Sequence, residues 1–151
     1  MNDLRDLYQE IILDHNRNPR NFRAIEGATL TLEGHNPLCG DRYTVYLLLD
    51  GDVVKDISFT GAGCAISKAS ASVMTSLLKG KTRAEAEALF QQFHKVATGA
   101  DAVGEEELES LGKLGAFAGV REFPMRVKCA TLAWHTMHNG LEGKREAATT
   151  E

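Results

Sequence analysis

The chain has 151 residues, of which 43% are apolar, and its 17 basic and 21 acidic side chains give a net charge of −4. This length predicts a single domain with a substantial core, and the acidic balance excludes the basic surface that nucleic-acid binding requires. No stretch approaches the roughly 20 apolar residues of a membrane-spanning helix, so we expect no membrane association.

The first half of the chain predicts one helix followed by an antiparallel sheet. Apolar residues at helical spacing predict a helix that begins at Asp3 and ends before Pro19. Residues typical of strands then predict three of them, at about residues 29–33, 43–49 and 53–59. Asp50-Gly51 joins the last two strands as a hairpin, so the outer ends of these strands should lie together.

The second half of the chain predicts helices. Apolar residues at helical spacing predict a helix from just after Cys64 to Lys79-Gly80. Thr82 and Glu85 then form a capping box for the next helix. The remaining elements are a loop at 98–104, a short helix that opens at Glu105 and ends near Gly112 or Gly115, a break at Phe123-Pro124, and a last helix from about Arg126 to Met137. The expected fold is therefore α+β, with a three-stranded antiparallel sheet packed against several helices. We expect one domain over residues 1–141 and a polar, disordered tail over 142–151.

Three cysteines carry the chemical signal of this chain. Cys39 lies in Asn36-Pro37-Leu38-Cys39-Gly40-Asp41, Cys64 follows Gly61-Ala62-Gly63, and Cys129 follows Arg126-Val127-Lys128. The hairpin predicts that Cys39 and Cys64 are close in space, and the spacing of two places Cys39 and Asp41 on one face of a strand. Three thiolates and a carboxylate make a tetrahedral donor set for Zn²⁺, or three thiolates and an oxygen for an iron–sulfur unit.

Each of these residues also has a simpler interpretation. A single cysteine is often a small buried hydrophobic residue, and Cys129 lies near an apolar helix face. Asp41 could serve as an Asx-turn residue, and no short C-x₂-C pair proves a metal site. Against this, the helix start after Cys64 and the cationic residues before Cys129 both favour thiolates. An odd number of cysteines behind a polar, acidic N-terminus also predicts reduced thiols in the cytoplasm.

The chain resembles the U-type iron–sulfur cluster assembly proteins (the IscU/NifU-like family), and within them the SufU branch. The resemblance covers residues 3 to about 140 and rests on segments 7–15, 18–21, 36–41, 61–71 and 123–134. Lys128 stands where IscU-type chains carry a histidine, and residues from about 99 to 120 match an insertion of the SufU branch. Both features favour SufU over the scaffold IscU.

The resemblance implies a specific site and a specific partner. It implies Zn²⁺ bound by four residues, namely Cys39, Asp41, Cys64 and Cys129. A PLP-dependent cysteine desulfurase of the SufS type would pass persulfide sulfur to Cys39, with Arg126 and Lys128 contacting that partner. The sulfur would continue to a downstream cluster scaffold.

Two alternatives use the same residues. The chain could itself be a scaffold that binds iron and assembles a [2Fe–2S] cluster on these ligands, or a binding module with a purely structural zinc. A Cys–His hydrolase is disfavoured, because no histidine lies beside a cysteine with an orienting partner.

Overall fold

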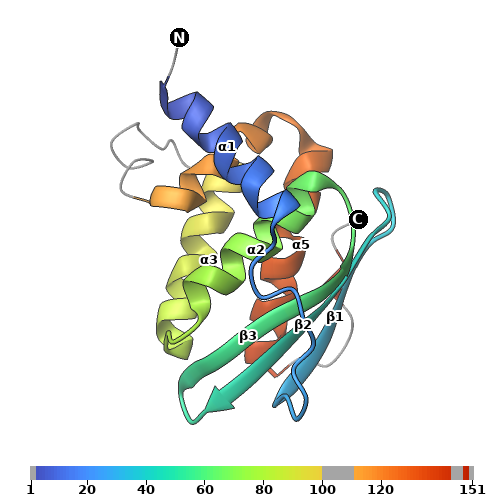
Figure 1. Cartoon of the computed structure of the whole chain (residues 1–151), viewed down its shortest axis with the longest axis vertical. Helices are drawn as coiled ribbons and strands as arrows, with labels where there is room; N and C mark the ends of the chain where they lie inside the picture. Colours follow the sequence, from blue (N-terminus) through green and yellow to red (C-terminus); the bar gives the residue numbers. More distant parts are fainter. Residues whose placement is uncertain (1–2, 100–110, 144–147, 150–151) are drawn as a thin grey trace.

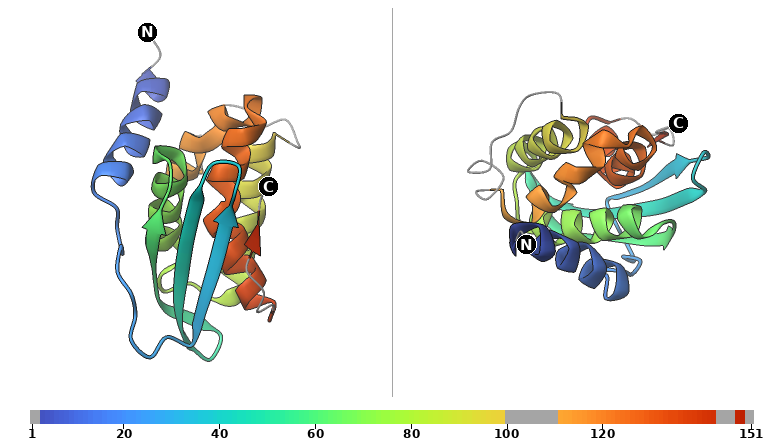
Figure 2. Two further views of the ribbon diagram at one scale, coloured as in Figure 1. Left: turned by 90° about the vertical axis from the view of Figure 1, so that its right-hand side faces the viewer. Right: turned by 90° about the horizontal axis from the view of Figure 1, so that it is seen from above.

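The computed structural model describes residues 3–99, 111–143 and 148–149. Within them the elements are α1 (Asp3–Arg17), β1 (Leu30–Asn36), β2 (Asp41–Asp50), β3 (Val53–Ala62), α2 (Ala65–Leu78), α3 (Arg83–Thr98), the 3₁₀ helix η1 (Gly112–Glu122), α5 (Pro124–Leu141) and β4 (Ala148–Thr149). Helices α2 and α5 pack against the sheet, while α1, α3 and η1 pack against those helices (Figures 1 and 2). The result is a sheet with helices on one face.

The sheet has the strand order β3-β2-β1-β4. Strands β1, β2 and β3 pair antiparallel, which confirms the predicted α+β fold and its three-stranded sheet. Strand β4 is an addition, because Ala148 and Thr149 pair in parallel with Gly34 and His35. A two-residue pairing is too short to produce a periodic signal, so the sequence pattern does not reveal it.

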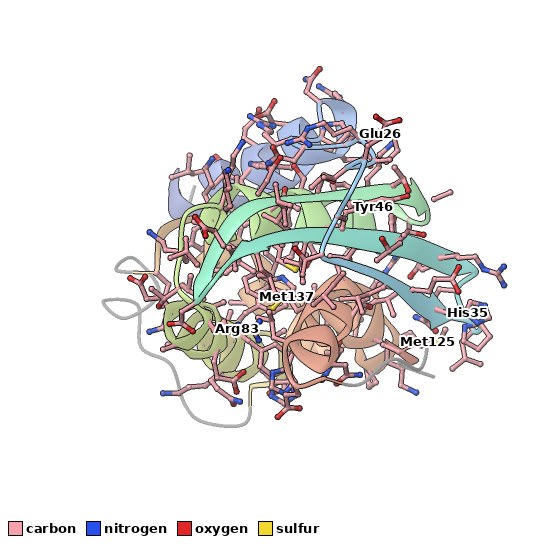
Figure 3. All side chains as sticks on the ribbon, turned by 90° about the horizontal axis from the view of Figure 1, so that it is seen from below. Glu26, His35, Tyr46, Arg83, Met125 and Met137 are labelled. Atoms are coloured by element: carbon pink, nitrogen blue, oxygen red, sulfur yellow. The ribbon has the colours of Figure 1, made fainter. Side chains whose placement is uncertain are left out.

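Alternation along β2 decides which side chains enter the core. Asp41, Tyr43, Val45 and Leu47 are all buried, and the residues between them are more exposed. Facing them are apolar side chains of the helices, such as Trp134, which stacks on Phe93, and Met137, which Figure 3 shows beneath the sheet. A carboxylate therefore occupies the first position of an otherwise apolar row.

Helix α5 is longer at both ends than the sequence predicts. It begins at Pro124, because proline at the first helical position lacks only an N–H group that has no partner in the helix. It continues through Gly140, where a Cβ would overlap Leu32 Cδ1 of β1. Glycine here permits close packing of helix on sheet and does not end the helix.

Two further helix predictions have different outcomes. The capping box of α3 is confirmed, since Thr82 accepts from the Glu85 N–H at 3.1 Å and Glu85 from the Thr82 N–H at 3.0 Å. The short helix expected from Glu105 starts outside the described residues. The helix η1 occupies Gly112–Glu122 and is not predicted by the sequence.

The contact between α1 and α2 contains a buried histidine. His15 is 1% exposed, and its Nδ1 lies 2.7 Å from Ser72 Oγ of α2, which also accepts from the Arg20 N–H at 2.8 Å. Burial, together with the charges of Arg20 and Lys113, lowers the pKa of His15 to about 4, and the charge of Asp14 partly offsets this decrease. The folded chain therefore holds this imidazole neutral at pH values where a solvated one would be protonated.

We expect this histidine to make the chain acid-sensitive. The pKa is lower in the folded state, so the unfolded chain binds a proton first as the pH falls below about 6.5, and stability declines until the pH reaches about 4. Urea unfolding at pH 7, 6 and 5 should show a smaller decline for His15→Gln than for the wild type. Equal declines in the two proteins would contradict this assignment. His135, whose pKa burial also lowers to about 4, remains in both and cancels in the comparison.

Candidate metal centre

The tip of the β1–β2 hairpin carries two of the expected ligands. The Cys39 N–H donates to the Asn36 carbonyl at 3.3 Å, and Gly40 has a φ of +72°, a value that glycine adopts without strain. Cys39 is partly exposed on this turn, whereas Asp41, the first residue of β2, is 0% exposed. The turn thus places a reachable thiol beside a buried carboxylate.

Cys64 lies at the adjoining edge of the sheet, just after β3, as the N-cap residue of α2. Its N–H donates to Asp41 Oδ1 at 2.9 Å, so the structure brings Cys64 to the carboxylate as the hairpin pattern predicts. Its sulfur accepts from the Ser67 N–H at 3.4 Å. Cys64 is also partly exposed.

Cys129 comes from the first turns of α5 and is 1% exposed. The Asn36 amide donates to its sulfur at 3.8 Å. One ligand atom from each of Cys39, Asp41 and Cys129 lies within 4.8 Å of the others, and among the described residues no other three potential ligands form such a group. The Cys64 sulfur is outside this group of three but adjoins it, since Cys64 is among the neighbours that affect the Cys129 thiol.

The electrostatics of this group fit a cation. Burial raises the pKa of the Cys129 thiol well above its usual value, and its neighbours Asp41, Cys39 and Cys64 add to the effect. Asp41 Oδ2 is buried and has no hydrogen-bond partner among the described residues. A buried carboxylate oxygen without a partner is destabilising, and thiols in such a setting release their protons when a metal binds. These buried donor groups are therefore more favourable with a bound metal ion than without one.

The two basic residues before Cys129 face different surroundings. Arg126 is exposed in the first turn of α5. Lys128 is half-buried and lines a pocket of about 270 Å³ between α3 and α5, together with His94 and His135. Arg126 is therefore the more exposed of the two.

Large apolar side chains near the cysteines are exposed. Leu38 and Phe123 are each 58% exposed, and Met125, labelled in Figure 3, is 50% exposed. Leu38 adjoins Cys39 in the turn, while Phe123 and Met125 lie at the start of α5. Exposed apolar side chains therefore lie in both of the segments that carry Cys39 and Cys129. The sequence does not predict this, because exposure is not visible in a residue pattern.

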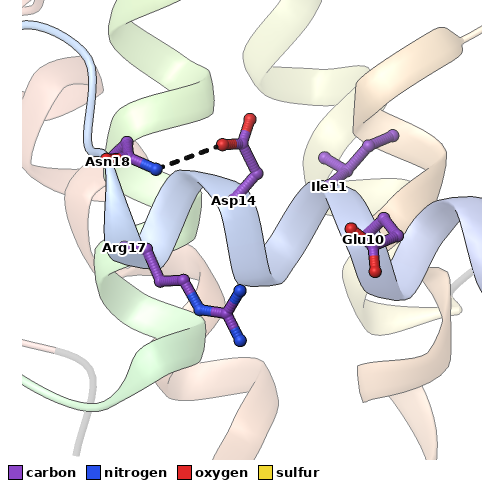
Figure 4. A pocket seen from close by; sticks show the side chains of 5 residues that line it. All are labelled: Glu10, Ile11, Asp14, Arg17 and Asn18. Carbon is purple, nitrogen blue, oxygen red and sulfur yellow. Dashed lines mark hydrogen bonds between the residues drawn. The ribbon is translucent and has the colours of Figure 1, made fainter.

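A second pocket lies along α1 and is lined by Glu10, Ile11, Asp14, Arg17 and Asn18 (Figure 4). None of the four expected ligands lines it. Asn18 donates to Asp14 at 3.5 Å within it. Its lining is of mixed charge and contains no cysteine, serine or histidine. Separately, none of the helices in the described part of the chain is both long and apolar enough to cross a membrane.

The chain is similar to known proteins over most of its length. It is 40% identical to the zinc-dependent sulfurtransferase SufU of Bacillus subtilis, over 92% of each chain. It is 35% identical to the iron–sulfur cluster assembly scaffold protein IscU of Streptococcus pyogenes, over 97% of this chain and 90% of that one. A solved structure of a candidate cluster assembly scaffold for the SUF system from Fervidobacterium islandicum superposes with a TM-score of 0.77 at 38% identity, covering 91% of this chain and 95% of that one. The model of the NifU-like N-terminal domain matches residues 7–130, and the chain belongs to that family of iron–sulfur cluster assembly proteins.

Proposed function

We propose that this chain is a zinc-bound sulfur acceptor that takes persulfide sulfur from a PLP-dependent cysteine desulfurase of the SufS type through Cys39. The observation that supports this most is the position of Cys39, whose thiol is accessible on a turn and adjoins two buried ligand residues. The similarity to a relative named as a zinc-dependent sulfurtransferase agrees with it.

The proposed metal site comprises Cys39, Asp41, Cys64 and Cys129. Bound Zn²⁺ would keep the thiols deprotonated at neutral pH. The chain's own residues orient the ligands, because the Cys64 N–H holds Asp41 and the Asn36 amide donates to the Cys129 sulfur.

The transfer step is a thiol–disulfide type exchange. The Cys39 thiolate attacks the terminal sulfur of the desulfurase persulfide, the S–S bond of that persulfide breaks, and the desulfurase cysteine leaves as a thiolate. Cys39 then carries the persulfide, and no external oxidant or reductant is needed. A downstream cluster scaffold would receive this sulfur, and a reducing compartment such as the cytoplasm would keep the thiols available.

The desulfurase would approach the exposed apolar residues beside the site. Leu38, Phe123 and Met125 provide apolar contacts, and Arg126 provides a positive charge at the same end of α5. Interfaces enriched in large apolar side chains and arginine are common.

The proposal is tested by metal analysis and by sulfur uptake. Protein purified without added metal should contain zinc in stoichiometric amount. After incubation with the desulfurase and cysteine, its intact mass should increase by one sulfur atom, and the increase should be absent when the desulfurase is omitted. Zinc-containing protein that gains no sulfur would contradict the proposal.

A scaffold function is the second candidate, favoured by the 35% identity to a relative named as an IscU scaffold protein. It would use the same ligands for a [2Fe–2S] cluster. Anaerobic reconstitution distinguishes the two functions, since a stable cluster at stoichiometric iron in protein that is purified without zinc would favour the scaffold.

A further inference from the structure

Ser67 forms three hydrogen bonds with Cys64. The Ser67 N–H donates to the Cys64 sulfur at 3.4 Å, and the Ser67 hydroxyl donates to the Cys64 carbonyl at 3.0 Å. The Cys64 thiol lies 3.6 Å from Ser67 Oγ, which accepts from it. Ser67 is 1% exposed, whereas Cys64 is partly exposed, so the serine side of these contacts is buried.

Tyr43 orients this serine from the sheet. Its hydroxyl lies 2.9 Å from Ser67 Oγ, and because the only hydroxyl proton of Ser67 goes to the Cys64 carbonyl, Tyr43 is the donor. Tyr43 is 1% exposed, and its ring packs edge-on against Phe59 with centroids 5.8 Å apart. A buried residue of the sheet thus holds the Ser67 side chain in place.

The result is an asymmetry between the two accessible cysteines. Cys64 is bound through its N–H to Asp41 and through its carbonyl and sulfur to Ser67. The backbone N–H of Cys39 is bonded only within its own turn, to Asn36. These bonds fix the position of Cys64 at the start of α2. Its sulfur is therefore the less free of the two to move toward an incoming reactant.

We propose that Ser67, oriented by Tyr43, is a positioning residue that keeps Cys64 a stationary ligand and thereby directs incoming sulfur to Cys39. This inference rests on the proposed function in one respect, namely that sulfur is transferred to this chain. The positioning part concerns only the relative reactivity of two thiols, so it can be tested whether or not sulfur is transferred.

The first test measures thiol reactivity in the protein as purified. Limited alkylation with iodoacetamide, followed by peptide mapping, gives the rates at Cys64 and Cys39. Ser67→Ala should raise the Cys64 rate relative to the Cys39 rate roughly tenfold, by analogy with losses of residues that orient metal ligands. Tyr43→Phe should change the ratio of the Cys64 rate to the Cys39 rate in the same direction but by less. It provides the test if Ser67→Ala does not fold. Ser76→Ala is the matched control, because Ser76 is exposed on the same helix and, within the described part of the chain, its hydroxyl bonds only to the Val73 carbonyl.

The second test maps the persulfide after incubation with desulfurase and cysteine. The wild type and Ser76→Ala should carry it on Cys39, whereas Ser67→Ala should carry a share on Cys64. The absorption spectrum of the Co²⁺-substituted protein should also change in Ser67→Ala, because the thiolate geometry at the metal changes. Unaltered alkylation ratios in both Ser67→Ala and Tyr43→Phe would overturn the inference. If the wild type accepts no sulfur but the variants still show altered alkylation ratios, the proposed function is contradicted and the positioning role remains supported.

Discussion

Replacing Cys39 with serine should reduce sulfur uptake to the level seen without desulfurase. A hydroxyl does not attack the terminal sulfur of a persulfide at neutral pH, whereas a thiolate does. Cys39 lies partly exposed on a turn, so the metal-free variant should lose no more than about 0.5 kcal/mol of unfolding free energy, as other surface substitutions do. Intact mass after incubation with desulfurase and cysteine measures the uptake, and urea unfolding measures the stability.

Cys64→Ser is the informative comparison for this variant. It removes another expected ligand but leaves the attacking thiol, so it should retain part of the uptake. Undiminished uptake by Cys39→Ser would contradict the assignment of the acceptor. Equal losses of zinc, stability and uptake in both variants would instead indicate a structural zinc.

Gly63→Ala should disable the site without replacing any ligand. A Cβ at this position would lie 2.5 Å from Asp41 Oδ1, 2.5 Å from Ser67 Oγ and 2.6 Å from the Tyr43 hydroxyl. The Tyr43 and Ser67 hydroxyls are hydrogen-bonded to each other, and Asp41 Oδ1 accepts from the Cys64 N–H, so none of the three atoms can move away freely. We expect zinc affinity to fall about 10- to 100-fold, as for other residues that orient ligands, and stability to fall by about 1–3 kcal/mol from overpacking.

Chelator competition measures the zinc affinity of Gly63→Ala, and urea unfolding measures its stability. Gly119→Ala is the control, because a Cβ there would meet no atom within 4 Å. Wild-type zinc affinity in Gly63→Ala would show that Asp41 is not held as described.

Local patterns predict the parts of this site that lie near one another along a hairpin. The spacing of Cys39 and Asp41 and the Asp50-Gly51 turn suffice to bring these two residues to the edge that carries Cys64, and the hydrogen bond from Cys64 to Asp41 agrees. The approach of Cys129 depends on how α5 packs against β1, which no periodicity encodes. The sequence offers Cys129 as part of a complete donor set, and the resemblance to a known family implies that it joins the site.

The residues that support the ligands were not predicted. Tyr43 and Ser67 have the patterns of a strand core residue and a small helix residue, and their hydroxyls meet only because α2 packs on β3 beside them. Asn36 precedes the turn of Cys39, and its amide reaches a sulfur 93 positions away in sequence. Contacts of this kind are set by tertiary packing, which a local pattern does not specify.

The position of Asp41 within the row of core residues would couple metal occupancy to folding. Its buried Oδ2 has no hydrogen-bond partner among the described residues and would gain a bond when a cation is present. Whatever binds only the folded state raises its stability by mass action. Under the proposed function, empty copies would therefore open more often than loaded ones and be degraded first.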